Sequence, residues 1–413
     1  MTGGEKGRAG FLDVLAVPQV RALWVAQLLS VLGDQVARIA LTVLVFGRTG
    51  SAALTALTYA LTFLPDLVAG PLLSGLADRF PRRVLMVVTD VARAVLVGAM
   101  ALPGMPLPVL ATLLVVVQLL AAPFNAARAA ILPHVVSGER YVVAAALTGT
   151  TYQGAQVLGF AVGGPLVGAI GVSPALAVNA ASFVLSAVLL RFGVAEQRVD
   201  TARDRDGAHP TPGTRLGAGA RVVWGDPRLR LLVALACVSA FVVTVEGLAA
   251  PYAAALGAGP SAVGVLLAAN PLGTVLGILV VTRLVAPRLR VRLLGFLAVA
   301  SCVPLIASAL DPGLVVLAAL WVASGVACAY QVPANAAFVA AVPDAHRGQA
   351  FGLALTALRV TQGVGVLVSG VVAESAGPAR AVAWSGLAGS AVAVVLAVMW
   401  GRLLAREGGV LGT

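Results

Sequence analysis

Five of the charged side chains that lie within long apolar stretches of the sequence are the residues best placed to do chemistry. They are Asp34, Arg38, Asp66, Glu246 and Arg359. A charge at the centre of a bilayer costs about 2.5–3.5 kcal/mol on insertion scales, so such residues usually face a cavity and have partners. Asp34 and Arg38 are one helical turn apart and can form an ion pair. Asp66 and Glu246 have no cation at that spacing, and acids in such surroundings bind and release protons. We therefore expect Asp34, Asp66 or Glu246 to couple proton movement to function.

Amide side chains are a second group of polar residues within these stretches. Some of them are expected to hydrogen-bond a bound molecule, while others join neighbouring helices, and the sequence does not separate the two roles. The candidates for the first role are Asn125, Gln153, Gln156, Gln331, Asn335 and Gln362.

The apolar stretches predict the elements that position these groups. The chain has 413 residues, of which 60% are hydrophobic and 11% charged, whereas a soluble domain is about 25% charged. A membrane span needs about 20 apolar residues, and backbone surrounded by lipid must be helical. We therefore predict an all-α membrane protein with twelve transmembrane helices. They cover about 21–46, 52–75, 84–102, 107–131, 141–170, 173–192, 229–255, 261–284, 291–310, 314–340, 348–373 and 379–403.

An internal repeat divides these spans into two related halves. The segment from Pro123 to Pro133 matches the segment from Pro333 to Pro343 at six of eleven positions. Duplicated membrane halves are how many secondary transporters build a central site. The predicted organisation is a cytoplasmic lead (1–20), a six-helix bundle (21–192), a cytoplasmic linker (193–228), a second six-helix bundle (229–403) and a cytoplasmic tail (404–413). The segment 215–230, which begins in the linker and ends at the start of the second bundle, is also a candidate amphipathic helix at the membrane surface.

The net charge of +11 is explained by membrane topology. With the N-terminus inside, the basic residues gather in the cytoplasmic segments, and the outer loops carry only Arg48 and Arg380. This asymmetry predicts that both termini are cytoplasmic. Aromatic residues do not alternate with the basic clusters, so we expect no nucleic-acid partner. The abundance of Ala, Val, Gly and Arg is typical of a GC-rich bacterial genome, which predicts a bacterial inner (cytoplasmic) membrane.

Enzyme chemistry is not indicated by any motif. The three histidines lie in loops without a Cys or Ser partner at informative spacing, and the chain has no phosphate-binding Gly-Lys-Ser/Thr loop. The three cysteines fall within predicted spans and are interpreted as apolar packing residues. We therefore expect no enzyme activity, no metal site and no cofactor, with a proton gradient as the energy source.

A charged turn between the second and third spans carries the most specific motif. It runs from Ser74 to Arg83 and contains Asp78, Arg79, Arg82 and Arg83. The arginines can anchor the turn on the inner leaflet, and Asp78 can accept hydrogen bonds from a neighbouring helix N-terminus. Such a contact can hold one conformation and release in the other. A plain positive loop is the simpler alternative.

This turn resembles the loop signature of the major facilitator superfamily, with Ser74 and Pro81 in place of two glycines. The resemblance implies a fold of two pseudo-symmetric six-helix bundles, with Asp78 held near Arg347 at the start of the eleventh span. In drug exporters of that family, an arginine of the fourth span is linked to proton transfer. Arg128 is the residue here, although it lies low enough to pair with the charged turn instead.

A glycine-rich motif in the fifth span is similar to the Gly-Pro signature of exporter branches of that superfamily. Glycines allow close helix packing, and proline removes one backbone hydrogen bond. Ordinary helix packing is the alternative explanation. The motif comprises Gly159, Gly163, Gly164, Pro165 and Gly168. Gly33-Asp34 and Leu132-Pro133 make the chain most similar to the siderophore and macrolide efflux branch.

Three functions remain open from the sequence. The first is a permease, expected to be monomeric, that exports a small amphipathic compound such as a drug, siderophore or secondary metabolite in exchange for protons. The second is a proton-linked nutrient importer, and the third is a lipid flippase or a membrane receptor without transport activity. For a flippase, Arg38 and Arg359 are the cations available near the membrane centre.

Overall fold

The fold is entirely helical in the part of the chain that the structure describes. The structure is a computed structural model, and it describes residues 10–65, 76–196, 220–343 and 346–410. Packing divides the chain into two compact units, and each is treated by itself. Unit 1 comprises the described residues of 1–40 and 68–206, and unit 2 those of 41–67 and 207–413.

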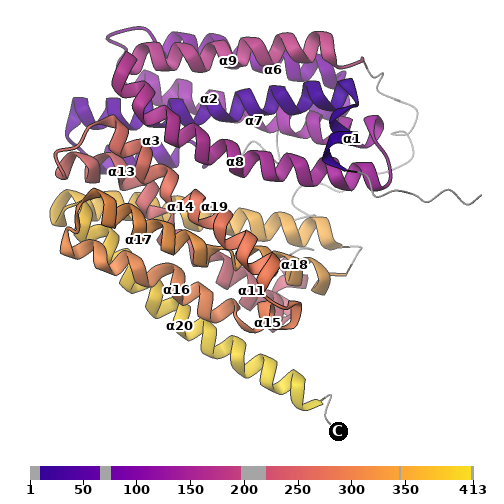
Figure 1. Cartoon of the computed structure of the whole chain (residues 1–413), viewed down its shortest axis with the longest axis vertical. Helices are drawn as coiled ribbons and strands as arrows, with labels where there is room; N and C mark the ends of the chain where they lie inside the picture. Colours follow the sequence, from indigo (N-terminus) through magenta and orange to yellow (C-terminus); the bar gives the residue numbers. More distant parts are fainter. Residues whose placement is uncertain (1–9, 66–75, 197–219, 344–345, 411–413) are drawn as a thin grey trace, which may run out of the picture. The chain divides into compact units, whose positions relative to one another are not determined.

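Unit 1 is a bundle of long helices with two short ones. Its elements are α1 (Phe11–Leu15), α2 (Pro18–Thr49, as far as Ala40), α5 (Leu76–Arg79), α6 (Arg82–Met100), α7 (Leu107–Val135), α8 (Glu139–Ile170) and α9 (Val172–Gly193). Helix α6 packs against α7 and α9, and α8 packs against α1 and α9 (Figure 1). Leu23, Met86, Phe124, Ile131 and Leu190 form a buried apolar core with contributions from α2, α6, α7 and α9.

Helices α2 and α9 approach each other closely at Gly33. A methyl group at this position would overlap the side chains of Asn179 and Ser182. Glycine therefore allows the two helices to approach closely beside Asp34.

Unit 2 contains the end of α2, the helix α3 and the helices of the C-terminal half of the chain. They are α3 (Ala52–Ala60), α11 (Pro227–Cys237), α12 (Ser239–Val242), α13 (Thr244–Ala255), α14 (Pro260–Leu284), α15 (Pro287–Arg292), α16 (Leu294–Ile306), η1 (Ala307–Leu310), α17 (Gly313–Cys328), α18 (Gln331–Ala341), α19 (Arg347–Ala376) and α20 (Pro378–Val410). Residues 220–225, part of the predicted amphipathic segment, are also helical.

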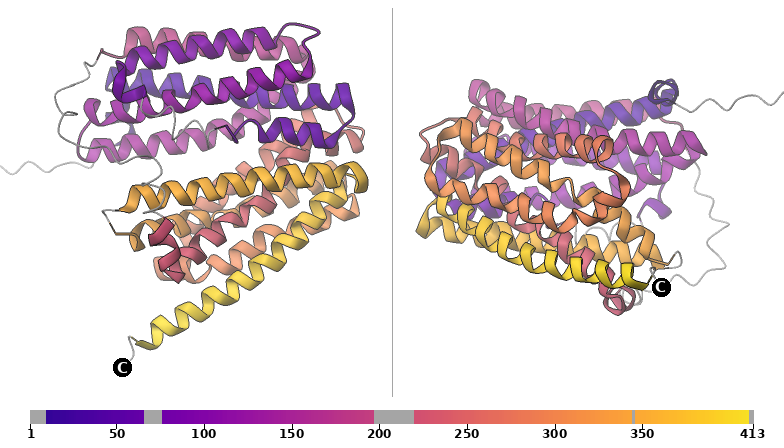
Figure 2. Two further views of the ribbon diagram at one scale, coloured as in Figure 1. Left: turned by 180° about the vertical axis from the view of Figure 1, so that it is seen from behind. Right: turned by 60° about the horizontal axis from the view of Figure 1, so that its bottom comes forward.

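Large aromatic residues fill the core of unit 2. The ring of Trp321 meets that of Tyr252 edge to face, with 6.1 Å between centroids. The Tyr330 hydroxyl donates to the backbone oxygen of Leu235, and the Trp400 indole N–H donates to that of Val291. These bonds satisfy the polar atoms of buried aromatic side chains. Helix α14 packs against α17, and α16 against α20. Figure 2 shows α19 and α20 joined by a short turn. Gly377, the residue between the two helices, has a positive φ.

The predicted all-helical membrane fold is confirmed, and the described residues contain helix at each of the twelve predicted spans. Nine segments of the described chain are long and apolar enough to cross a membrane. The predicted span 229–255 is interrupted at Val238 and Val243, and 314–340 is interrupted near Ala329. Packing also places the described residues 41–65 with unit 2, although they lie within the predicted first bundle.

Candidate functional site

The charged residues of α6 lie on its buried face. The buried positions of this helix recur every three or four residues, and Asp90 and Arg93 are among them. Apolar neighbours such as Met86 and Val97 continue the same face. The helical period that buries one side of α6 in unit 1 therefore also buries an acid and a base.

Arg93 joins α6 to α2 through an ion pair with Asp34. Its Nη2 atom lies 3.1 Å from Oδ2 and 3.4 Å from Oδ1 of Asp34. The Arg93 side chain is 3% exposed, whereas that of Asp34 is 26% exposed. The Ser30 hydroxyl lies 3.5 Å from Nη1. Asp34 is therefore the more exposed member of this pair.

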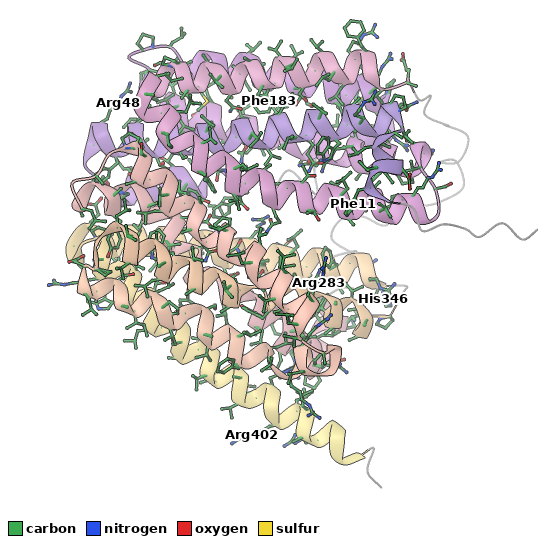
Figure 3. All side chains as sticks on the ribbon, in the orientation of Figure 1. Phe11, Arg48, Phe183, Arg283, His346 and Arg402 are labelled. Carbon is green, nitrogen blue, oxygen red and sulfur yellow. The ribbon has the colours of Figure 1, made fainter. Side chains whose placement is uncertain are left out.

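Asp90 is the second carboxylate near the same guanidinium. Its side chain is fully buried, and its Oδ1 atom lies 3.8 Å from Nη1 of Arg93. The Ser186 hydroxyl of α9 donates to Oδ2 at 2.5 Å, whereas Oδ1 has no hydrogen-bond partner within the described chain. The ring of Phe183, labelled on α9 in Figure 3, lies 4.0 Å from the guanidinium carbon. We name these groups, Asp34, Asp90, Arg93, Phe183 and Ser186, the acid–arginine cluster.

Glu246 of α13 occupies a different environment in unit 2. The hydroxyl of Tyr59, which is 1% exposed, donates to its Oε2 atom. The Tyr59 ring packs edge to face on that of Phe63, with centroids 6.0 Å apart. Next to Glu246, Gly247 lies against Ala56, which brings α13 close to α3. An acid of α13 and a phenol of α3 are thus joined within one unit.

Another carboxylate binds the beginning of α3. Oε1 of Glu374, near the end of α19, accepts from the Ser51 hydroxyl and from the Ala53 backbone N–H at 3.0 Å. Gly370, one turn earlier, lies against Ala52, Ala53 and Ala56. A carboxylate at a helix N-terminus satisfies donors that have no partner within the helix. Glu374 therefore caps α3 and joins it to α19.

The other charged residues predicted for the site are Arg38, Asp66 and Arg359. Arg38 donates to Gln35 at 3.4 Å, and Arg359 is half-buried on α19. Asp66 lies outside the described residues. Among the amide candidates, Gln362 donates to Ser239 at 3.2 Å. The others are half-buried or exposed on their helices, and they are Asn125, Gln153, Gln156, Gln331 and Asn335.

The charged turn is held to unit 1 by its arginines. Arg82 donates to the backbone oxygen of Ala130 at 3.0 Å. Arg83 donates to Val194 at the end of α9 and forms a 2.5 Å ion pair with Glu196. Arg79 is exposed. The side chain of Asp78 lies outside the described residues, so its contact with α19 stays a prediction. Half-buried Arg128 lies on α7.

The glycine motif of α8 packs on α2 next to the acid–arginine cluster. Gly159 lies against Gln35, and Gly163 against Val36 and Ile39. Helix α8 continues through Pro165, with Gly164 and Gly168 in the same segment. These contacts explain the first two glycines by close helix packing, and the exporter interpretation of the motif remains a prediction.

Several of these residues were not singled out as site residues from the sequence. Asp90 and Arg93 carry the same signal as Asp34, since they are charges within an apolar stretch. Tyr59 carries none, because a tyrosine in a membrane span is usually a packing residue. Among the described residues, no group of three or more His, Cys, Asp or Glu side chains is arranged to hold a metal ion.

The described fold and its buried charges define a multi-pass helical membrane protein. The family model of the Major Facilitator Superfamily matches residues 23–253 and 244–410. The chain belongs to this superfamily, and the family expectation from the charged turn is confirmed.

A curated relative and solved structures agree with this assignment. "Uncharacterized MFS-type transporter YfiS" of Bacillus subtilis (strain 168) is 27% identical over 227 residues, which are 54% of this chain and 53% of the relative. The match thus spans about half the length of that relative. The nucleoside transporter NupG has a TM-score of 0.71 at 15% identity, covering 94% of this chain and 99% of that structure. A POT family transporter in complex with a thioalcohol conjugated peptide has a TM-score of 0.72 at 10% identity, covering 93% and 96%. At these identities the structures show the fold alone.

Proposed function

We propose that the chain is a secondary active transporter that exports a small amphipathic organic compound in exchange for protons. The observation that carries this proposal is the acid–arginine cluster, in which one buried guanidinium faces two carboxylates. Ionisable groups inside membrane helices are expensive and usually mark ion or substrate pathways. An arginine between two acids has two discrete arrangements, which is what a switch between two conformations requires.

Coupling follows from the difference in affinity between two conformations. Protonation of a carboxylate changes the populations of the two conformations only if the proton binds one of them more tightly, and the same holds for substrate. Asp34 is exposed enough to meet either a proton or a substrate, and its neighbour Arg93 is buried. A change at Asp34 therefore alters how strongly α2 is held to α6. The glycine motif on α8, similar to that of exporters, supports the outward direction.

Everted membrane vesicles test the proposal. The vesicle interior is acidified, and a panel containing a macrolide, a hydroxamate siderophore, a lipophilic cation and an uncharged steroid is added. We expect at least one compound to drive proton release from vesicles that contain the chain. Asp34→Asn should lose this response because it removes the carboxylate that pairs with Arg93. Asp311→Asn is the matched control, since it removes an exposed loop carboxylate at a left-handed position that Asn also tolerates.

Other outcomes point to other functions. Equal proton release by the wild type and Asp34→Asn would exclude Asp34 from coupling. Concentrative uptake of the compounds by intact cells would identify an importer. Movement of a fluorescent lipid between the leaflets of liposomes would identify a flippase, and binding without any flux would identify a receptor.

A further inference from the structure

We infer that Asp90 holds the exchanged proton, and that a substrate presenting a cationic group to Asp34 displaces this proton by sending Arg93 to Asp90. The inference rests on the proposed function and deepens it, because it names the proton carrier and the substrate class. It is carried by the geometry of the acid–arginine cluster within unit 1.

The surroundings of Asp90 favour its neutral form. The side chain is fully buried, and Oδ1 has no hydrogen-bond partner in the described chain. The 3.8 Å separation from Nη1 of Arg93 is beyond hydrogen-bond length. An ionised oxygen left without a donor in the interior costs more than an uncharged one. A proton on Oδ1 makes Asp90 neutral, so that Arg93 and Asp34 remain as a balanced pair.

The guanidinium has a free donor with which to change partners. The Nε atom of Arg93 is buried without a partner among the described residues. The guanidinium carbon of Arg93 lies 4.0 Å from the centroid of the Phe183 ring, which attracts the cation without occupying a hydrogen-bond donor. A shift toward Asp90 would therefore gain hydrogen bonds for Arg93 and for Oδ1 together.

The neighbouring helices determine which acids belong to the cluster. Helix α2 contributes Asp34 and Ser30, and α9 contributes Ser186 and Phe183. The buried side chains of α7, which also packs on α6, are apolar. Asp34 and Asp90 are thus the two acids of the cluster, and 26% exposure makes Asp34 the one that an incoming cation meets.

The exchange balances in charge and in protons. Before binding, Asp34 is ionised and paired with Arg93, and Asp90 is protonated. The arriving cation pairs with Asp34, and Arg93 moves to Asp90. The O–H bond on Oδ1 then breaks, the electron pair stays on the carboxylate, and the proton passes to water at the exposed end of the cluster. One cation is taken up for each proton released.

Proton release on ligand binding tests this inference without transport. The purified full-length chain is placed in weakly buffered detergent solution with a pH indicator. Tetraphenylphosphonium is added as a permanent cation that carries no proton of its own, and triphenylphosphine oxide serves as its uncharged match. We expect the wild type to release about one proton per bound cation, and none with the uncharged probe. Asp90→Asn should bind the cation with proton release reduced about tenfold, whereas Asp34→Asn should bind the cation about tenfold more weakly.

A second variant decides the question if Asp90→Asn does not fold. Ser186→Ala keeps the acid but removes the hydroxyl that stabilises its ionised form. With the cation bound, the pH at which half of the protein molecules have released their proton should then rise. Ser137→Ala, in the exposed connection between α7 and α8, should leave that pH unchanged.

Three results would overturn the inference. They are unchanged proton release by Asp90→Asn, an unchanged release profile in Ser186→Ala, and failure of the wild type to bind the cation. If the wild type still moves protons with an uncharged compound in the vesicle assay, the proposed function stands although the inference fails.

Discussion

The two units hold their intramembrane acids in different ways. In unit 1, Asp34 pairs with a buried guanidinium that also faces a second carboxylate. In unit 2, Glu246 accepts a hydrogen bond from the phenol of Tyr59. Loss of a buried cation leaves charge uncompensated, whereas loss of a hydroxyl removes one hydrogen bond. Acids that look alike in the sequence are therefore expected to respond very differently when their partners are removed.

The largest effect is expected from Arg93→Met. Removing one partner of a buried ion pair destabilises a protein by about 3–5 kcal/mol, because the remaining charge is left unpaired. Denaturant unfolding in detergent measures this loss of stability. Arg21→Met, which removes an exposed arginine of α2, should change the stability by less than about 0.5 kcal/mol. Equal losses in the two variants would show that Arg93 does not hold the cluster together.

Tyr59→Phe is expected to have a smaller effect in unit 2. It removes the hydroxyl that binds Glu246 and keeps the buried ring, so the cost is about 1.5–3 kcal/mol if the acid is ionised. The same unfolding assay provides the measurement. Tyr152→Phe, at a tyrosine that is 38% exposed on α8, is the control. A loss as large as that of Arg93→Met would remove the contrast between the units.

Gly33→Ala tests whether helix packing positions Asp34. The added methyl group would overlap Asn179 and Ser182, and overpacking of this kind costs about 1–3 kcal/mol. At Gly98 on α6, an added methyl group would meet nothing within 4 Å among the described residues. Gly98→Ala should therefore be neutral or stabilising by up to about 1 kcal/mol. If both variants unfold at the same denaturant concentration, α2 and α9 do not approach as closely as described.

The smallest effect is expected from Glu374→Gln at the beginning of α3. Its carboxylate is exposed, so replacing it should weaken the cap by only about 0.5 kcal/mol. Hydrogen exchange at the Ala53 amide, which donates to Glu374, should then become about twofold faster. Asp13→Asn, at the cap of another helix, α1, should leave that amide unchanged. Unaltered exchange in Glu374→Gln would mean that the cap does not protect α3.

Much of the fold was predictable, because membrane helices are long and apolar. The predicted spans 141–170 and 173–192 agree with α8 and α9 to within two residues. The breaks at Val238 and Val243 were not predicted, because they interrupt an apolar run without glycine or proline at those positions. Packing of residues 41–65 with unit 2 was also not predictable, since it depends on contacts between segments far apart in the sequence and not on local pattern.

The site was predictable only as a set of candidate charges. Asp34 and Glu246 were identified because charge is rare within an apolar stretch. Their partners Arg93 and Tyr59 are far away in the sequence, and which side chains meet depends on the rotation of each helix in its bundle. Spacing along one helix suggested Arg38 as the neighbour of Asp34, whereas the ion pair described is with Arg93.

The proton on Asp90 is tested most directly by infrared difference spectroscopy of the carboxyl C=O stretch. A protonated carboxyl and an ionised carboxylate absorb in different regions, so the two states of one acid are separated. At neutral pH the wild type should show a protonated-carboxyl band that is absent in Asp90→Asn and lost when tetraphenylphosphonium binds. A band that persists in Asp90→Asn, or one that the cation does not change, would contradict proton storage at Asp90.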